Sequence, residues 1–116
     1  MKKHKTIKKN YYIRRIIHKG KKTKNNLYLV SYFRNKYEWN RIGIAVSKKL
    51  GNAVVRNKQK RLVREAVRLL DKYNKKGYDV IVKVNNNAKN LDVAYSRLKE
   101  AYSKLGIYEE DINKNN

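Results

Sequence analysis

The spacing of hydrophobic residues in the first half of the chain predicts a short helix followed by two strands. An apolar face with helical spacing lies between Asn10, a candidate cap, and Gly20, a stop signal. Residues 27–33 (LYLVSYF) are rich in aromatic and β-branched side chains, and residues 41–47 (RIGIAVS) alternate in polarity, so both segments predict strands. We expect these strands to pair as a hairpin across the polar turn of residues 34–40. The preceding KKTKNN is expected to be a polar connection.

The second half of the chain predicts a long helix, a strand and a closing helix. Gly51 is free to adopt a positive φ, and Asn52 is suited to cap a helix from about residue 53 to residue 73. Residues 78–84 predict a strand, and residues 91–105 predict a helix that ends at a glycine. This order of elements indicates an α+β fold. We expect a two-layer α/β sandwich whose mixed sheet is covered by helices on one face and left partly accessible on the other.

The length of 116 residues suits one small domain. We expect residues 1–8 to form a basic mobile arm, residues 9–108 a single domain and residues 109–116 a frayed tail. The chain has no Cys, and His4 and His18 are its only histidines, so disulfides and thiolate metal sites are excluded and no metal site is expected. No run approaches the roughly 20 apolar residues of a membrane span, and the N-terminus lacks the apolar region of a secretory signal. We therefore expect a cytoplasmic protein.

The charge balance indicates that this small domain binds polyanions. The chain has 31 Lys and Arg residues against 9 Asp and Glu residues, a formal net charge of +22. Thirteen of these cations precede Glu38, the first acidic residue. Such an excess favours nucleic acid as the partner, with an anionic membrane surface as the second class.

The predicted long helix concentrates this charge on one face. At about 100° per residue, its polar arc collects Asn57, Lys60, Arg61, Arg64 and Arg68. Like charges four residues apart cost stability unless a polyanion lies against them, and Glu65 is the only acid in their midst. The preference for Arg suits bidentate phosphate contacts. A merely solvated basic face is the alternative interpretation.

The segment from Ser47 to Glu65 (SKKLGNAVVRNKQKRLVRE) resembles the signature of the bacterial ribonuclease P protein component. The resemblance extends over about residues 7–105 and includes RIGI at 41–44 and YDVIV at 78–82. It implies an α/β sandwich with a left-handed βαβ crossover around the long helix. It also implies an accessory protein subunit of a ribonucleoprotein endonuclease that removes the 5′ leader of precursor tRNA. In that family the active site and its Mg²⁺ ions belong to the RNA subunit.

The resemblance implies two sets of contact residues and no catalytic residue in this chain. The set expected to face the RNA subunit, to which the basic arc adds its last member, is Lys48, Lys49, Asn52, Arg56, Asn57, Lys60, Arg61, Arg64 and Arg68. The set expected to line a leader-binding cleft between the first helix and the sheet is Tyr12, Ile13, Ile17, Tyr28 and Tyr32. Family members often carry Phe where this chain has Ile13 and Ile17, and an aromatic residue where it has Ser31. The bases of the leader then stack on the tyrosines instead, or they contact aliphatic side chains.

Other functions remain open alternatives at this stage. A nuclease acting by itself would need clustered carboxylates or a histidine pair, and the nine acids are scattered or confined to the tail. A ribosomal or assembly protein has a similar composition but not this signature. DNA binding is weakened by a polar helix face of nearly uniform charge, which offers little for reading bases. Membrane-surface attachment would need the apolar helix face that must cover the sheet. No obligatory protein partner is evident.

Overall fold

The computed structural model describes residues 5–109, which form three α-helices and a four-stranded sheet. In chain order the elements are α1 (Asn10–Lys19), β1 (Lys21–Lys24), β2 (Tyr28–Arg34), β3 (Arg41–Val46), the 3-10 turn η2 (Lys48–Leu50), α2 (Ala53–Leu70), the 3-10 turn η3 (Asp71–Tyr73), β4 (Tyr78–Val84) and α3 (Leu91–Lys104). The predicted helices and strands are all present. The last predicted turn of the long helix is the 3-10 turn η3.

The sheet has the order β1-β2-β4-β3, so the predicted hairpin between β2 and β3 is wrong. Strand β4 lies between them, antiparallel to β2 and parallel to β3. The physical reason is burial: six of the seven residues of β4 are buried, and only a central position hides both faces of a strand. The parallel pair β3 and β4 is joined through α2, which makes a βαβ unit. The left hand of this crossover stays a prediction from the resemblance.

The KKTK segment forms the edge strand β1, whereas the sequence pattern predicts a polar connection there. Lys21 pairs with Tyr32 and Lys24 with Leu29, in antiparallel register. Three of its four side chains are exposed. Strand pairing uses only backbone groups, so an edge strand with solvated side chains leaves no hydrophobic pattern to detect.

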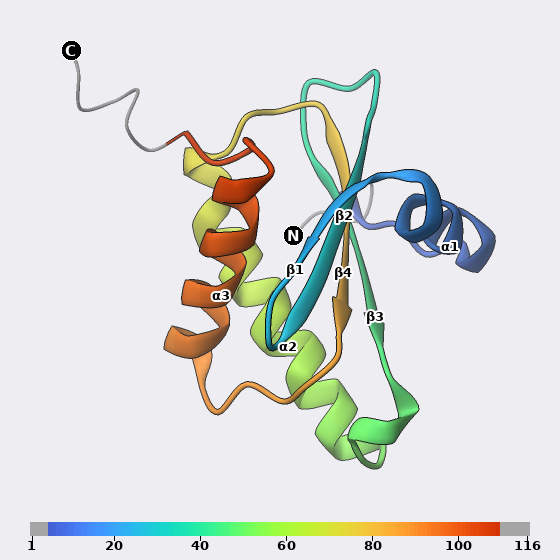
Figure 1. Cartoon of the computed structure of the whole chain (residues 1–116), viewed down its shortest axis with the longest axis vertical. Helices are drawn as coiled ribbons and strands as arrows, with labels where there is room; N and C mark the ends of the chain where they lie inside the picture. Colours follow the sequence, from blue (N-terminus) through green and yellow to red (C-terminus); the bar gives the residue numbers. More distant parts are fainter. Residues whose placement is uncertain (1–4, 110–116) are drawn as a thin grey trace.

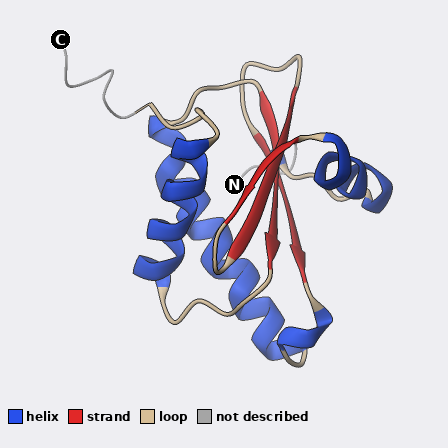
Figure 2. Cartoon of the chain, in the orientation of Figure 1, coloured by secondary structure: helices blue, strands red, loops and turns tan. Residues whose placement is uncertain are grey.

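Helices α2 and α3 cover one face of the sheet and α1 covers part of the other (Figure 1; Figure 2). The larger core lies under α2 and α3 and includes Val63, Leu70 and Leu98 against strand residues such as Val80 and Val82. The smaller core lies under α1 and consists of Ile7, Ile13, Ile16 and Ile81. Gly43 permits this second core to close, because a Cβ there would lie 2.7 Å from the Ile81 Cδ1 atom.

The chain is packed closer to its ends than the sequence predicts. Thr6 forms a bridge with Ile42, and the Ile7 amide donates to the Ile42 carbonyl at 2.7 Å. Ile7 is buried, so the expected mobile arm of residues 1–8 is wrong for these two positions. At the other end, the Glu109 amide donates to the Tyr73 carbonyl at 2.8 Å. Residues 1–4 and 110–116 of the two predicted terminal segments lie outside the described residues.

Candidate nucleic-acid interface

The turn between β3 and α2 fixes the direction of the basic helix. Gly51 has a φ of +144°, a region that glycine adopts readily. Asn52 caps α2, its Oδ1 accepting a hydrogen bond from the Val55 amide at 3.1 Å. Lys48 and Lys49, two residues of the expected set, are exposed in this turn. Asn52 therefore caps α2, in addition to the contact with the RNA subunit that the resemblance implies.

Two adjoining hollows form a groove between α1, the edge strand β3 and the first turns of α2. We call it the basic groove. The larger hollow, of about 520 Å³, is lined by residues that include Ile13, Arg14, Ile17, Arg56, Asn57, Lys60 and Lys83. The smaller, of about 260 Å³, shares Ile13 and Lys60 with it and adds Lys8 and Arg64. The groove thus joins residues that the sequence analysis assigns to two separate sets.

The basic groove has six cations and, among its described lining residues, no acid. These cations are Lys8, Arg14, Arg56, Lys60, Arg64 and Lys83. The Nε of Arg56 is buried and has no hydrogen-bond partner among the described residues. Buried donors are normally satisfied, so Arg56 Nε is an unpaired donor beneath the wall of the groove. The floor is aliphatic, formed by Ile13, Ile17 and Ile44 together with Ala45 and Val46.

Arg14 and Lys83 are groove residues that the sequence analysis missed. Lys83 is the one half-buried position in β4, on the face opposite Val82 and Val84. A lysine between the two valines at the end of a largely apolar strand is the signal that could have found it. Arg14 lies next to Ile13 on α1, and the sequence does not distinguish it from the many other cations of the N-terminal segment.

Five members of the expected RNA-subunit set lie outside the basic groove: Lys48, Lys49 and Asn52 before α2, and Arg61 and Arg68 on it. Arg61 and Arg68 are exposed on α2 but line neither hollow. Arg68 donates two hydrogen bonds to Glu65, at 3.1 and 2.5 Å. These hydrogen bonds and the positive charge of Arg68 lower the pKa of the Glu65 carboxyl. Part of the charge of Arg68 is therefore neutralised within the helix.

Of the five residues predicted for the leader-binding cleft, the structure brings only Ile13 and Ile17 together in the basic groove. Ile13 and Ile17 line the basic groove, whereas Tyr28 and Tyr32 project from the opposite face of the sheet. Tyr28 is completely buried under α2 and α3, and burial raises the pKa of its hydroxyl to about 12. Tyr32 packs edge-on against Tyr78 at 5.0 Å between ring centroids. The assignment of these two tyrosines to the cleft is therefore wrong.

The α1-facing side of β2 carries packing residues instead. Ser31 is buried, and its hydroxyl donates to the Ile16 carbonyl at 2.5 Å. Gly20 lies against it, since a Cβ on Gly20 would be 2.5 Å from the Ser31 Oγ. A small residue at position 31 therefore brings the end of α1 down onto the sheet.

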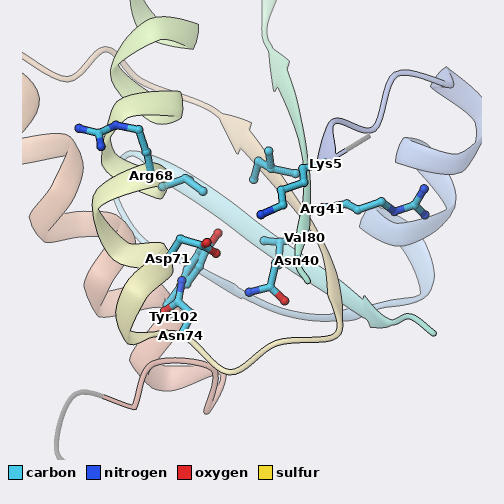
Figure 3. A pocket seen from close by; sticks show the side chains of 10 residues that line it. Lys5, Asn40, Arg41, Arg68, Asp71, Asn74, Val80 and Tyr102 are labelled. Atoms are coloured by element: carbon cyan, nitrogen blue, oxygen red, sulfur yellow. The ribbon is translucent and has the colours of Figure 1, made fainter. Parts of the chain in front are cut away.

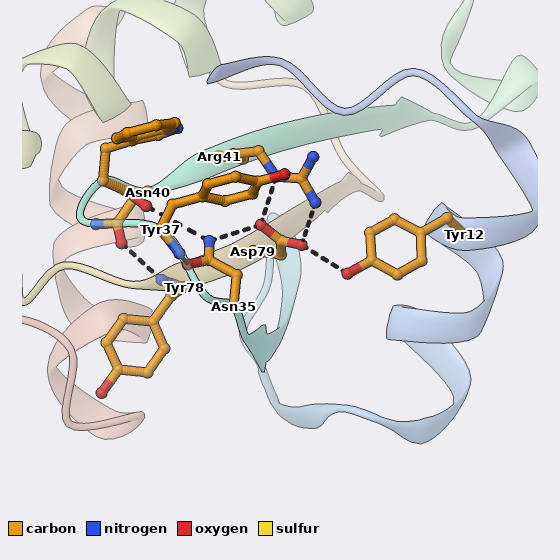
Figure 4. Close-up of polar contacts among 8 residues, drawn as sticks. Tyr12, Asn35, Tyr37, Asn40, Arg41, Tyr78 and Asp79 are labelled. Atoms are coloured by element: carbon orange, nitrogen blue, oxygen red, sulfur yellow. Dashed lines mark hydrogen bonds and ion pairs between the residues drawn. The ribbon is translucent and has the colours of Figure 1, made fainter. Parts of the chain in front are cut away.

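Tyr12, the remaining predicted cleft residue, belongs to a buried polar network on β4 (Figure 4). Its hydroxyl donates to Asp79 Oδ2 at 2.6 Å, and the Asn35 amide donates to Asp79 Oδ1 at 2.8 Å. Arg41 donates to both carboxylate oxygens, at 2.8 and 2.6 Å. Burial alone would raise the pKa of Asp79, but these donors outweigh it and hold that pKa below its usual value.

A third hollow lies beside this network and continues the basic groove. We call it the tyrosine pocket: Thr6, Ile7, Lys8, Lys9, Tyr11, Tyr12 and Arg41, with a volume of about 520 Å³. It shares Thr6, Ile7 and Lys8 with the smaller hollow of the groove. Tyr11 is 66% exposed, an unusual state for a ring of this size.

A separate hollow of about 380 Å³ lies between the last turns of α2 and the start of β3 (Figure 3). It is lined by Asp71, Asn74 and Tyr102 as well as Lys5 and Arg68. Asp71 is ion-paired with Lys76, and Arg68 with Glu65. Because it contains a carboxylate and its helical arginine is already paired, this hollow is less suited to a polyanion than the basic groove.

Metal-ligating side chains are not grouped in residues 5–109: no three His, Asp or Glu residues there lie close enough to hold a metal ion. Over the same residues, no helix is long and apolar enough to cross a membrane.

The mixed sheet, its helices and the acid-free groove define a small α+β protein whose main surface feature is concentrated positive charge. A family model described as Ribonuclease P matches residues 1–106. The ribonuclease P protein component of Clostridium botulinum (strain 657 / Type Ba4) is 42% identical over 105 residues, covering 88% of this chain and 95% of the relative. That of Thermoanaerobacter sp. (strain X514) is 37% identical over 99 residues, covering 85% and 84%.

Solved structures agree with these relatives. The RNase P protein of Staphylococcus aureus superposes with a TM-score of 0.80 at 34% identity, covering 90% of this chain and 98% of that one. The RNase P protein of Thermotoga maritima gives a TM-score of 0.62 at 28% identity, covering 84% and 88%. The chain therefore belongs to the bacterial ribonuclease P protein family. Proteins of this family are subunits of a ribonucleoprotein endoribonuclease of tRNA processing, so an RNA subunit is the implied partner.

Proposed function

We propose that this protein binds the 5′ leader of precursor tRNA in the basic groove and the catalytic RNA subunit on the exposed face of α2. By doing so it aids the endonucleolytic removal of the leader that gives the mature 5′ end. The observation that carries the proposal is the convergence of six cations, with no acid among the described lining residues, on a groove with an aliphatic floor.

The two surfaces suit different forms of RNA. The basic groove has walls on both sides, so it favours a single strand whose bases can turn toward the aliphatic floor while its phosphates meet the cations. The convex face of α2 cannot enter the narrow groove of an RNA duplex, but its exposed Arg61, and Arg64 at its border with the basic groove, can reach phosphates of folded RNA. Neither surface offers much for reading bases, which fits leaders of variable sequence.

Catalysis in this proposal belongs to the RNA subunit, which also holds the Mg²⁺ ions. The described residues offer no carboxylate cluster that fits such an ion, and Asp79, the buried acid of β4, is fully engaged by Arg41, Tyr12 and Asn35. The contribution of the protein is charge neutralisation and substrate positioning. We place it in the cytoplasm, with the RNA subunit and precursor tRNA as partners and neither a membrane nor an obligatory protein partner.

The test is 5′ processing of a precursor tRNA at limiting magnesium, with a bacterial ribonuclease P RNA alone, this protein alone and the two together. We expect efficient cleavage only in the mixture. Cleavage by the protein alone would contradict the assignment of catalysis to RNA, and a mixture that behaves like RNA alone would contradict the role of a subunit.

A charge-matched pair of variants tests the groove. Arg14→Ala with Lys83→Ala removes two cations from the basic groove, and we expect weaker binding of leader-bearing precursor tRNA by the mixture. Lys75→Ala with Lys104→Ala removes the same charge from exposed positions outside the groove. Equal losses in the two double variants would mean that net charge, and not the groove, binds the leader.

A further inference from the structure

The tyrosine pocket supplies what the basic groove lacks. The groove has cations and aliphatic side chains but no aromatic ring among its described lining residues. The adjoining tyrosine pocket has Tyr11 and Tyr12 together with Lys8, Lys9 and Arg41, and again no acid among its described lining residues. A strand that leaves the groove past Lys8 therefore enters a basic and aromatic hollow.

The aromatic surface continues from the pocket onto the loop between β2 and β3. The Arg41 guanidinium lies 4.9 Å from the Tyr37 ring centroid and 5.9 Å from that of Tyr12 (Figure 4). Tyr37 in turn stacks on Trp39, with centroids 4.8 Å apart and planes inclined by 18°. Tyr37 is 44% exposed, and because Trp39 and Arg41 lie against its ring, the edge of the ring is what stays open to solvent.

This surface is held in place before any ligand arrives. Asp79, which is completely buried, fixes Arg41 through two hydrogen bonds and Tyr12 through one. The hydrogen bonds that Arg41 donates to Asp79 also raise the pKa of its guanidinium. Side chains that are already immobilised lose little entropy on binding, so their contacts contribute more to affinity.

We propose that the tyrosine pocket is a second binding site for single-stranded RNA. Bases of the leader that lie beyond the basic groove stack on the exposed ring of Tyr11 and contact the exposed edge of Tyr37, while Lys8 and Lys9 bind the phosphates. Stacking on a ring needs no particular base, which suits leaders of any sequence. The site rests on the proposed function, because the groove must first bind the leader and direct it to the pocket.

The site makes a prediction that the groove alone does not, namely that affinity still increases when the leader becomes long enough to pass beyond the groove. The test uses the holoenzyme reconstituted with a bacterial ribonuclease P RNA and measures its affinity for precursor tRNAs with leaders of stepped length. For long leaders we expect Tyr11→Ala to weaken binding about fivefold or more, the lower end for one stacked base, and Tyr37→Ala to weaken it less. For leaders that end within the groove we expect no change.

Two controls separate stacking from structural damage. Tyr11→Phe and Tyr37→Phe keep the rings and should bind long leaders as the unchanged protein does. Tyr95→Ala removes a half-exposed tyrosine of α3 that lies outside both the groove and the pocket, and it should leave all leader lengths unaffected. Losses that are the same for every leader length, or no loss with long leaders, would overturn the second site. If the unchanged holoenzyme does not prefer leader-bearing over leaderless tRNA, the proposed function itself fails.

Trp39 provides a readout that does not depend on affinity. It is the only tryptophan of the chain, and it stacks on Tyr37. We expect precursor tRNA with a long leader to change the tryptophan fluorescence of the holoenzyme and a short leader to leave it unchanged. A signal that is identical for long and short leaders would contradict contact at Tyr37.

Discussion

Arg41 and Asp79 form a bidentate ion pair between adjacent strands, at the first position of β3 and the second of β4. The Arg41 Nε donates to Asp79 Oδ1 at 2.8 Å and its Nη2 to Oδ2 at 2.6 Å. The two residues are register partners in the parallel pairing. Tyr12 of α1 joins the same carboxylate, so one buried acid connects the small helix, the edge strand and the centre of the sheet.

Asp79→Asn should destabilise the fold. The change removes the charge that balances Arg41, and breaking a buried ion pair on one side costs about 3–5 kcal/mol. We expect a loss of about 3 kcal/mol in the free energy of unfolding, because the Arg41 side chain keeps 24% exposure and water relieves part of the penalty. Urea unfolding measures it. Glu38→Gln, an equal charge change at an exposed position, should stay within about 0.5 kcal/mol. A loss below that figure for Asp79→Asn would refute the structural role of the pair.

The same pair predicts how stability depends on pH. The pKa of Asp79 is lower in the folded protein than in the unfolded chain, so below about pH 5 the unfolded state binds more protons. The stabilisation is fully present above the unfolded pKa of about 4 and is lost as pH falls through the folded value. Unfolding free energies of the unchanged protein and Asp79→Asn should therefore converge as the pH is lowered. A difference that is independent of pH would contradict the charge as its source.

Arginines on the exposed face of α2 should differ in their contribution to binding of the RNA subunit. Arg61→Ala or Arg64→Ala should weaken it by about 1–3 kcal/mol if each makes a charge-assisted phosphate contact. Arg68→Ala should cost less, because Glu65 already engages that guanidinium. Binding measured over a salt series checks the cause, since each lost contact lowers the slope of log affinity against log salt by about 0.7–0.9. Equal losses at all three positions would refute this ranking.

Tyr28→Phe tests the assignment of Tyr28 to the core. Its hydroxyl is buried and has no hydrogen-bond partner among the described residues, and an unsatisfied buried polar group costs about 1–3 kcal/mol. We expect the variant to be as stable as the unchanged protein or more stable, by thermal or urea unfolding. Its affinity for precursor tRNA should not change. Weaker leader binding by a fully folded Tyr28→Phe protein would instead indicate that Tyr28 contacts the leader.

The sequence predicts individual elements well where local signals are strong. Gly51 and Asn52 mark the start of α2, and the strand predicted at residues 78–84 has the bounds of β4. The signature on α2 also placed Arg56, Lys60 and Arg64 among the candidate contacts, and all three line the basic groove. These predictions depend on neighbours along the chain, which a sequence displays directly.

Spatial relationships between elements could not be predicted in the same way. Alternation along β2 divides Tyr28, Val30 and Tyr32 from Leu29, Ser31 and Phe33, but it does not say which face α1 covers. Likewise, the hydrophobic pattern of a strand shows which of its faces is buried but not which strands lie beside it. The position of β4 between β2 and β3 could therefore not be predicted. The groove residue Lys83 was missed for the same reason.

The two borders of the sheet have a consequence for the protein before it meets RNA. On one side the sheet ends in β1, a strand of only four residues, three of them lysines. On the other side Thr6 and the Ile7 amide occupy part of the outer edge of β3 at Ile42. Short, charged or covered edges prevent sheets of different molecules from joining into aggregates. The newly made chain can therefore stay monomeric until it binds an RNA that neutralises its charge.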